Sequence, residues 1–427
     1  MKQLRIFFSL IFFSLICFSA QAVEIVLERG VDTYNVAVAE FESDNATGNR
    51  LRNVIINNLA AYRQFNISHR NLTSRSRPLY RSRSIRPNYD DWQNTNAQFV
   101  VFARVDESNE RINVEFGLFD INARGIIFNK QMATPSANWR TLAHRMSTEV
   151  FYTLTGEKPS FSSRIAFVSD APGETEIHIM DWDGHNVRQI TRQNALIVAP
   201  AWAQDMRYLF YTSYRNVNPD LYRLDMQSGQ VNVISDYALQ NLGAQYSPVR
   251  NRIVVALGRD GNPELYTMDI NGRNLRRLTN TPRAIESDPH WSPCGEYILF
   301  ASDRTGPLRL YRMHYDTAQS RRLMRNEVLQ SEPNWSVNNV IAFTTRVNRM
   351  FQVATVNPDG SNFQVLTEGN FDSEQPAWSP CGEFIYYVSN KEGNKRIYRM
   401  NADGSNKTML TSTQAECKNP APSGFYF

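Results

Sequence analysis

The sequence predicts a two-domain α+β protein, in which a small N-terminal α/β domain precedes a six-bladed β-propeller closed by the C-terminal strand. Two observations support this prediction. In the second part of the chain an aromatic residue, usually Trp followed by Ser-Pro, returns every 43 to 45 residues, and half a repeat ends the sequence. The first part does not repeat, and its apolar residues follow strand periodicity in some stretches and helix periodicity in others.

The repeat has five aromatic anchors, Trp202, Tyr246, Trp291, Trp335 and Trp378, which are 44, 45, 44 and 43 residues apart. Each unit continues through a glycine turn, an apolar strand, a polar turn, a third strand and, in most units, an Asp-Gly turn. Four short strands in about 44 residues are typical of a propeller blade. Because the anchors define the repeat, we expect them to be packing residues.

The first blade begins near Arg164 and lacks its innermost strand. One more period after Trp378 reaches Pro422, inside the segment 418–422. We expect this segment to supply the missing strand and close the ring, which would protect the strand edges.

Residues 23 to about 160 predict the α/β domain. We expect strands at 23–27, 34–39, 98–102 and 114–119, and helices at 49–65 and 139–154. A short link at 156–163 would lead into the propeller. The predicted domains are therefore 23–160 and 161–427.

The first 22 residues predict a secretory signal peptide. Lys2 and Arg5 precede an apolar run at 6–18, and Ala-Gln-Ala at 20–22 is a small-x-small cleavage site. We expect export with cleavage after Ala22; the alternative is a buried first helix. Three cysteines would remain, Cys294, Cys381 and Cys417, and an odd count excludes a fully paired disulfide framework.

Enzyme signatures are missing from the sequence. It contains no Gly-x-Ser-x-Gly, no phosphate loop and no His-Glu-x-x-His, and its six histidines show no ligand spacing. Asp181-Trp182-Asp183-Gly184 resembles the start of a calcium loop, but the completing acid is absent, so we expect a structural turn. No catalytic residue, metal ligand or cofactor is predicted, although a weakly held ion in the propeller channel stays open.

Charge adds little to the prediction of partners. The net charge of +4 is too small to indicate nucleic acid. A run of arginines without intervening acids suggests either an anionic partner or a solvated loop; these are Arg70, Arg75, Arg77, Arg81, Arg83 and Arg86. We expect no nucleic-acid partner and no membrane-embedded segment.

Taken together, the signal peptide, the strand-like start at Val23, the α/β domain, the six Trp-Ser-Pro-type blades and the closing strand resemble the TolB family of the Tol-Pal cell-envelope system. The order of these parts carries the resemblance, which covers essentially residues 23–427. It implies a periplasmic, non-enzymatic protein that is peripheral to membranes and binds the lipoprotein Pal and the protein TolA, with other envelope proteins as further candidates. It also implies a role in outer-membrane integrity and cell division.

The resemblance assigns two binding regions. The TolA-binding segment would be Val23, Glu24, Ile25, Val26, Leu27, Glu28, Arg29, Gly30, Val31 and Asp32. The Pal-binding face would be formed where each blade's first strand begins, at Val198, Ala199, Gln240, Asn241, Ser287, Asp288, Ser331, Glu332, Ser373 and Glu374. Blade three departs from the repeat with Tyr246, and Cys294 and Cys381 replace the usual Asp of two turns.

Two other classes remain as alternatives. A propeller can accompany a hydrolase or peptidase domain, although the missing nucleophile elbow and the small leading domain argue against this. A glycan-binding propeller could use aromatic side chains as stacking platforms, which would require the anchors to be exposed.

Overall fold

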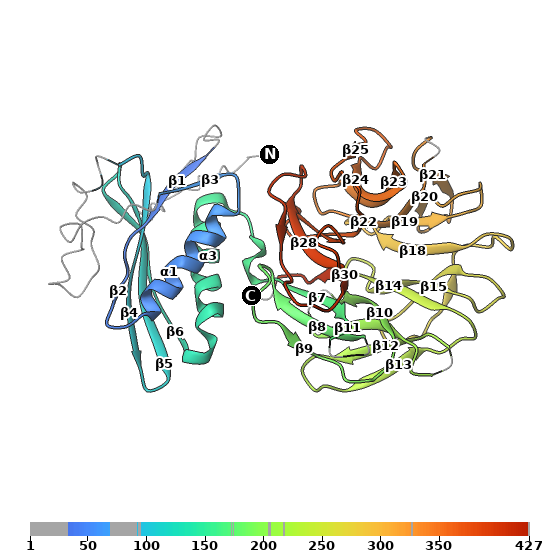
Figure 1. The fold of residues 1–427 in the computed structure, drawn as a ribbon, viewed down its shortest axis with the longest axis horizontal. Helices are drawn as coiled ribbons and strands as arrows, with labels where there is room; N and C mark the ends of the chain where they lie inside the picture. The colour runs from blue at the N-terminus through green and yellow to red at the C-terminus, as the bar shows by residue number, and fades with distance from the viewer. Residues whose placement is uncertain are drawn as a thin grey trace, which may run out of the picture.

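The computed structural model describes residues 33–68, 92, 95–171, 173, 175–203, 206–216, 218–325 and 328–425. The predicted signal peptide, the strand expected at 23–27 and the arginine run at 70–86 lie outside these residues. The described chain forms a sheet with two helices, followed by a ring of six four-stranded sheets (Figure 1). None of its helices is long and apolar enough to cross a membrane.

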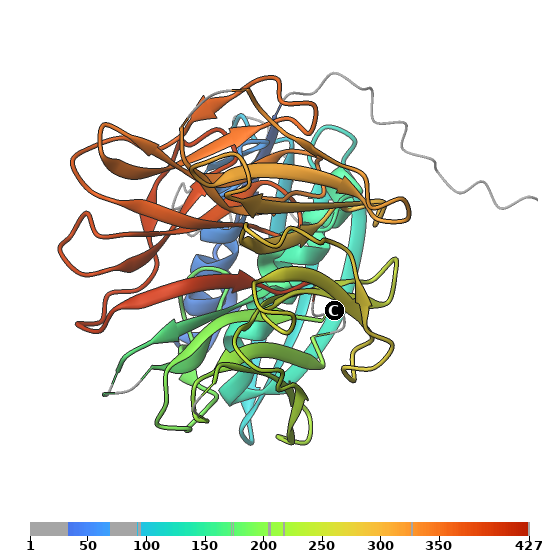
Figure 2. The ribbon, with the colours of Figure 1, turned by 90° about the vertical axis from the view of Figure 1, so that its right-hand side faces the viewer.

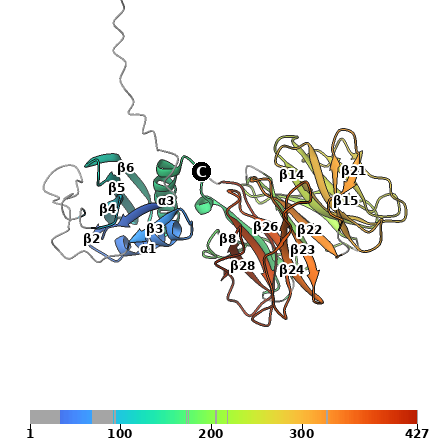
Figure 3. The ribbon, with the colours of Figure 1, turned by 90° about the horizontal axis from the view of Figure 1, so that it is seen from above.

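The first sheet has the strand order β3-β1-β4-β5-β6, with β2 paired to β4. Its strands are β1 (Tyr34–Val38), β2 (Glu42–Ser43), β3 (Phe65–Ser68), β4 (Phe99–Ser108), β5 (Arg111–Asp120) and β6 (Gly125–Pro135), and its long helices are α1 (Thr47–Ala60) and α3 (Trp139–Thr155). Both helices cover the sheet face that is turned toward the propeller (Figures 1 and 3). The apolar stripe of α3, Leu142, Met146, Val150 and Leu154, is buried as its spacing predicts.

The structure corrects two details of the predicted α/β domain. The first helix ends at Ala60, and Phe65 belongs to β3, where it pairs in parallel with Tyr34. Strand β6 has no counterpart in the prediction, because as an edge strand it is mostly exposed and carries polar residues that hide the strand alternation.

The six blades follow one after another around the ring (Figure 2). The strands of each blade are given from the innermost outward. Blade two contains β10 (Ile197–Trp202), β11 (Tyr208–Ser213), β12 (Asp220–Asp225) and β13 (Val231–Ser235). Blade three contains β14 (Asn241–Ser247), β15 (Arg252–Leu257), β16 (Glu264–Met268) and β17 (Arg276–Arg277). Blade four contains β18 (Glu286–Trp291), β19 (Tyr297–Ser302), β20 (Arg309–His314) and β21 (Ser320–Arg322). Blade five contains β22 (Gln330–Trp335), β23 (Ile341–Val347), β24 (Met350–Val356) and β25 (Gln364–Val365). Blade six contains β26 (Ser373–Trp378), β27 (Phe384–Ser389), β28 (Arg396–Asn401) and β29 (Thr408–Met409).

Blade one is assembled from both ends of the propeller sequence. It contains β7 (Arg164–Ser169), β8 (Glu176–Asp181) and β9 (Arg188–Gln189), and its innermost strand is β30 (Cys417–Pro422). Strand β30 pairs antiparallel with β7, with Cys417 opposite Ser169 and Pro422 opposite Ile165. The predicted closure of the ring by the C-terminal strand is thereby confirmed.

The aromatic anchors pack in the hydrophobic cores of the blades, as predicted. The four tryptophans are between 4% and 9% exposed, and Tyr246 is half-buried. These rings are not available as an exposed stacking platform, which removes the main support for a glycan-binding propeller. The three cysteines of the described chain are all free, and Cys417 is buried.

An aromatic cluster joins the helices to the propeller. Tyr62 after α1 contacts Phe384 of blade six, with ring centroids 4.9 Å apart, and Phe161 of the connecting segment contacts Trp182 of blade one at 5.3 Å. The predicted link at 156–163 is therefore a packed element, with a short 3-10 helix at Ser160–Ser162, whose backbone N–H at Ser160 donates to the Tyr62 hydroxyl.

Candidate functional site at the propeller channel

Each of the six innermost strands has a register shift against its neighbour, three residues before the aromatic anchor or its equivalent. The residues at this position share a left-handed backbone, with φ between 49° and 69°, and are Ala199, Gly243, Asp288, Glu332, Gln375 and Asn419. They line one cavity of about 170 Å³ in the centre of the ring. We call these six residues the bulge ring.

The sequence accounts for the bulges. In five of the six blades the bulge-ring residue is followed by proline, at Pro200, Pro289, Pro333, Pro376 and Pro420. Proline has no backbone N–H, so it cannot donate to the adjacent strand, and the ladder is interrupted there. A left-handed backbone conformation is energetically unfavourable for residues other than glycine. Such strained residues are concentrated at functional sites.

A chain of hydrogen bonds links neighbouring bulge-ring residues. The Glu332 carboxylate accepts from the backbone N–H of Gln375 at 3.0 Å and from the Thr344 hydroxyl at 2.7 Å. The Gln375 side-chain oxygen in turn accepts from the backbone N–H of Asn419 at 2.8 Å. The Asp288 carboxylate accepts from the backbone of Glu332 in the same sense. These side chains are therefore held in place before any partner arrives.

The chain of hydrogen bonds covers only part of the ring. Ala199 and Gly243, in blades two and three, have no polar side chain, whereas Asp288, Glu332 and Gln375, in blades four to six, do. The channel mouth therefore has an acidic, hydrogen-bonding arc and an open apolar arc. A partner that fits it would present a donor-rich or basic group on one side and apolar surface on the other.

Enclosure by the blades changes the ionisation of the acidic arc. Burial, together with the negative charge of Asp288, raises the pKa of Glu332 to about 7, although the Thr344 hydroxyl opposes the shift. Burial also raises the pKa of Asp288. His290 lines the same cavity, two residues after Asp288. Burial lowers its pKa to about 4, so this imidazole is uncharged at neutral pH and does not balance the negative charge of the acids.

Only some residues of the predicted Pal-binding face lie at the channel. Val198 and Ala199, Ser287 and Asp288, and Ser331 and Glu332 each end in a bulge-ring residue. In blade six the expected pair falls one residue early: Ser373 is buried, and Glu374 forms an ion pair with Lys395.

In blade three the expected pair falls two residues early, and Asn241 is a buried structural residue whose amide donates to the backbone oxygens of Pro219 and Tyr237. Gln240 is exposed. Sequence reasoning missed Gly243, Gln375 and Asn419 at the channel. A constant spacing of three residues before each anchor would have found them.

These features define a class: two-domain proteins in which a closed six-bladed propeller with a preformed channel mouth follows an α/β domain. Comparison with known families places the chain within it. The family model described as "TolB beta propeller domain" matches residues 151–426, and the model "TolB amino-terminal domain" matches residues 23–127. The chain belongs to the TolB family.

Individual relatives agree with this assignment. A Tol-Pal system protein TolB of Desulfosudis oleivorans is 31% identical over 191 residues, which is 45% of this chain and 43% of that protein. The aligned part thus spans less than half of the relative. The crystal structure of TolB from Acinetobacter baumannii is similar in fold, with a TM-score of 0.77 and 24% identity over 92% of this chain and 97% of that one. A chain of a nidogen/laminin complex is similar in fold over part of this chain, with a TM-score of 0.51 and 13% identity over 61% of this chain and 98% of that one.

Proposed function

We propose that this chain is the TolB component of a Tol-Pal system, acting without catalysis in the periplasm. In this proposal residues 1–22 are a cleaved signal peptide, 23–160 form the N-terminal domain and 161–427 form the propeller. The propeller binds the lipoprotein Pal at the channel mouth, residues 23–32 bind TolA, and the complex supports outer-membrane integrity and cell division. Membership of the TolB family supports this role.

The observation that carries the Pal-binding proposal is the fixed acidic arc of the bulge ring. A binding face gains affinity when its polar groups are already oriented, because little conformational entropy is then lost on association. The interblade hydrogen bonds to Asp288, Glu332 and Gln375 provide this orientation. The loops of a rigid propeller are also a common place for partner recognition.

The absence of catalysis in this proposal rests on membership of the TolB family. A general base works best with a pKa near the operating pH. His290, the histidine lining the cavity, has a pKa of about 4 because it is buried, and its Nδ1 lies 2.9 Å from the backbone oxygen of Trp291, so it does not meet this condition. Glu332, with a pKa of about 7, does meet it, so a screen with ester and peptide substrates tests the enzyme alternative directly.

The TolA-binding segment would act differently. A short extended segment can add to the edge of a partner's sheet or fold against its own domain, and these two arrangements exclude each other. Binding of Pal at the channel would then shift the balance between them. Residues 23–32 lie outside the described chain, so this part of the proposal rests on the family resemblance.

Calorimetry tests the proposal with residues 23–427 and the soluble domain of Pal from the same organism. We expect saturable binding that is lost in Asp288→Lys/Glu332→Lys and weakened in Asp288→Asn/Glu332→Gln. The control is Glu368→Lys, an exposed acid just after the outer strand β25. Circular dichroism checks that each variant folds. A folded wild-type chain that does not bind Pal would contradict the Pal-binding proposal.

A second experiment separates the two partners. Deletion of residues 23–32 should abolish binding to the soluble domain of TolA and leave Pal binding at the channel intact. Equal loss of both activities would contradict the division of roles between the segment and the propeller.

A further inference from the structure

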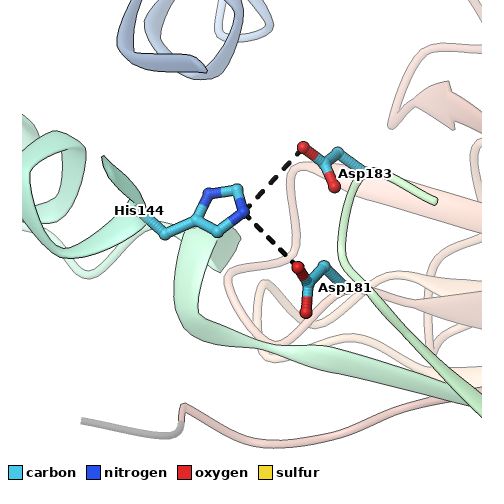
Figure 4. A group of neighbouring side chains, drawn as sticks. All are labelled: His144, Asp181 and Asp183. Atoms are coloured by element: carbon cyan, nitrogen blue, oxygen red, sulfur yellow. Dashed lines mark ion pairs between the residues drawn. The ribbon is translucent and has the colours of Figure 1, made fainter. Parts of the chain in front are cut away.

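A second polar cluster lies between the two domains and shares no residue with the channel mouth. His144 comes from α3, Asp181 ends β8, and Asp183 follows in the turn toward β9. The imidazole Nε2 of His144 is 3.8 Å from Oδ2 of Asp181 and 4.0 Å from Oδ2 of Asp183 (Figure 4). The three possible ligand atoms all lie within 4.8 Å of one another.

His144 is the unusual member of this cluster. Its side chain is 4% exposed, and its Nε2 atom has no hydrogen-bond partner among the described residues. Leaving a buried polar atom without a partner costs about 1 to 3 kcal/mol. Figure 4 shows this nitrogen directed at the two carboxylates, at distances too long for hydrogen bonds. This orientation therefore suits an ion bound between the three side chains.

The other imidazole nitrogen of His144, Nδ1, is held by a side chain of the N-terminal domain. Nδ1 of His144 lies 3.0 Å from the side-chain amide of Asn58 in α1, and that amide also donates to Ser147 at 2.8 Å. A histidine that binds a metal ion through Nε2 donates from Nδ1–H to an acceptor, which sets the ring orientation. The side-chain oxygen of Asn58 is buried without a partner in the part of the chain that the structure describes, and exchange of the two ends of this amide would place that oxygen against Nδ1 as the acceptor. Asn58 is fully buried, so this support is part of the helix packing.

One imidazole nitrogen and two carboxylate oxygens are a donor set suited to Zn²⁺, with a fourth position left for water. Calcium prefers oxygen ligands alone, so it is a poorer match. Tetrahedral Zn²⁺ with ligands at about 2.0 to 2.2 Å places neighbouring donor atoms roughly 3.3 to 3.6 Å apart. The separations from Nε2 would need to shorten by roughly 0.2 to 0.7 Å. The two carboxylates would therefore have to turn away from their present hydrogen bonds with Asn186 and Arg140.

Three other side chains compete with an ion for these carboxylates. The Asn186 amide donates to Oδ2 of Asp181 at 2.6 Å, and Nδ1 of His185 lies 3.4 Å from Oδ1 of Asp183. Arg140 is the strongest competitor. Its guanidinium is 2.5 Å from Oδ2 of Asp183, and its Nε is 3.9 Å from Oδ2 of Asp181. Arg140 therefore already neutralises one of the two negative charges. Two carboxylates face one guanidinium here, so the cluster favours a further positive charge.

We propose that His144, Asp181 and Asp183 form a Zn²⁺ site that joins α3 to blade one. Ligands from two domains would make metal binding stabilise their contact, since the ion binds only when both are in place. The proposal does not depend on the Tol-Pal role, because it concerns other residues and another ligand.

The test titrates Zn²⁺, and Co²⁺ as a spectroscopic probe, into tag-free, chelator-treated residues 23–427. We expect one site, visible absorption typical of four-coordinate Co²⁺ with nitrogen and oxygen ligands, and a higher melting temperature with Zn²⁺. His144→Gln and Asp181→Asn should each weaken Zn²⁺ binding by more than tenfold, and Asn58→Ala by about 10- to 100-fold. Asp288→Asn/Glu332→Gln is the control for an ion in the channel and should bind normally.

Arg140→Gln distinguishes a metal site from a simple ion-pair cluster. If the cluster binds Zn²⁺, removal of the competing guanidinium should tighten binding severalfold. The proposal is overturned if neither the folded wild-type chain nor the Arg140 variant binds Zn²⁺ or Co²⁺. It is also overturned if the stoichiometry and the Co²⁺ absorption are unchanged in folded His144→Gln and Asp181→Asn. Binding lost only in the channel variant would also overturn it.

Discussion

The backbone N–H of Asn419 donates a hydrogen bond to the side-chain oxygen of Gln375, with the two atoms 2.8 Å apart. This bond joins β30, the last strand of the chain, to the innermost strand of the blade before it. On its other side β30 accepts a hydrogen bond from the indole N–H of Trp202, at 3.0 Å from the backbone oxygen of Ala421. The closing strand thus touches the innermost strands of both neighbouring blades, while β7 holds it in blade one.

Removal of the closing strand should therefore destabilise the whole ring. Deletion of residues 417–427 exposes the edge of β7 and removes the buried Cys417. Since a domain is stabilised by only about 5 to 15 kcal/mol, we expect partial unfolding at room temperature, measured by near-ultraviolet circular dichroism and limited proteolysis. Deletion of residues 425–427 alone is the control. A full-strength near-ultraviolet signal in the longer deletion would contradict this account of closure.

The glycine of the Asp-Gly-type turn should be required for contact between blades. Gly272 has φ of +78°, and a methyl group there would lie 2.0 Å from the backbone oxygen of Ile234 in the preceding blade. Gly272→Ala should cost well over 1 kcal/mol in the free energy of unfolding. Gly261→Ala is the matched control, because Gly261 also has positive φ, +106°, but no atom lies within 4 Å of the added methyl. Denaturant titrations should rank Gly272→Ala as the less stable; equal losses would show that strain in φ alone matters.

The repeat in the sequence was enough to predict the ring, because the anchors Trp202, Trp291, Trp335 and Trp378 are buried at one position of each blade. It located the bulge ring in blades two, four and five but not in blades one, three and six, since Asn419, Gly243 and Gln375 share no residue type with Asp288 or Glu332. Their equivalence lies in a constant spacing of three residues before each anchor or its equivalent, and the positive φ shared by all six confirms it.

Other features depend on tertiary contacts that no local pattern records. His144 shows no ligand spacing to any other histidine, and its acidic neighbours are about 40 residues away on a different domain. The link at 156–163 looked like a connector, yet Phe161 is buried between the domains because Tyr62 and Trp182 close over it.

Trp182 should couple the stabilities of the two domains. Its ring is 1% exposed and contacts Phe161 and Phe384, and the Arg399 guanidinium lies 4.5 Å from its centroid. Trp182→Ala should cost about 3 to 5 kcal/mol. We expect the single unfolding transition of the wild type, followed by calorimetry, to separate into two. Tyr152→Ala on α3, where the side chain is 53% exposed, should change stability by less than about 0.5 kcal/mol. A single unshifted transition in Trp182→Ala would contradict the coupling.

The pKa of Glu332 predicts how stability depends on pH. Burial and the Asp288 charge raise the pKa of this carboxyl from 4.5 to about 7 in the folded chain. The folded state thus binds a proton that the unfolded state has released between these two values, and the stabilising contribution of protonated Glu332 is present below pH 4.5 and lost as the pH rises to 7. Glu332→Gln does not titrate. Its free energy of unfolding should therefore rise relative to wild type across this window, by at most about 1.4 kcal/mol per pH unit, and then level off.

Asp288→Asn provides the matched test of the cause. Removal of the neighbouring negative charge should lower the pKa of Glu332, so the upper end of the window should move below pH 7. Denaturant titrations of the wild type, both single variants and the double variant at several pH values measure this shift. If the difference between Glu332→Gln and wild type is the same at pH 5 and pH 8, the Glu332 carboxyl is not held in its protonated form by the channel. If the window is unchanged in Asp288→Asn, burial alone sets the pKa of Glu332 and the two acids of the arc are not coupled.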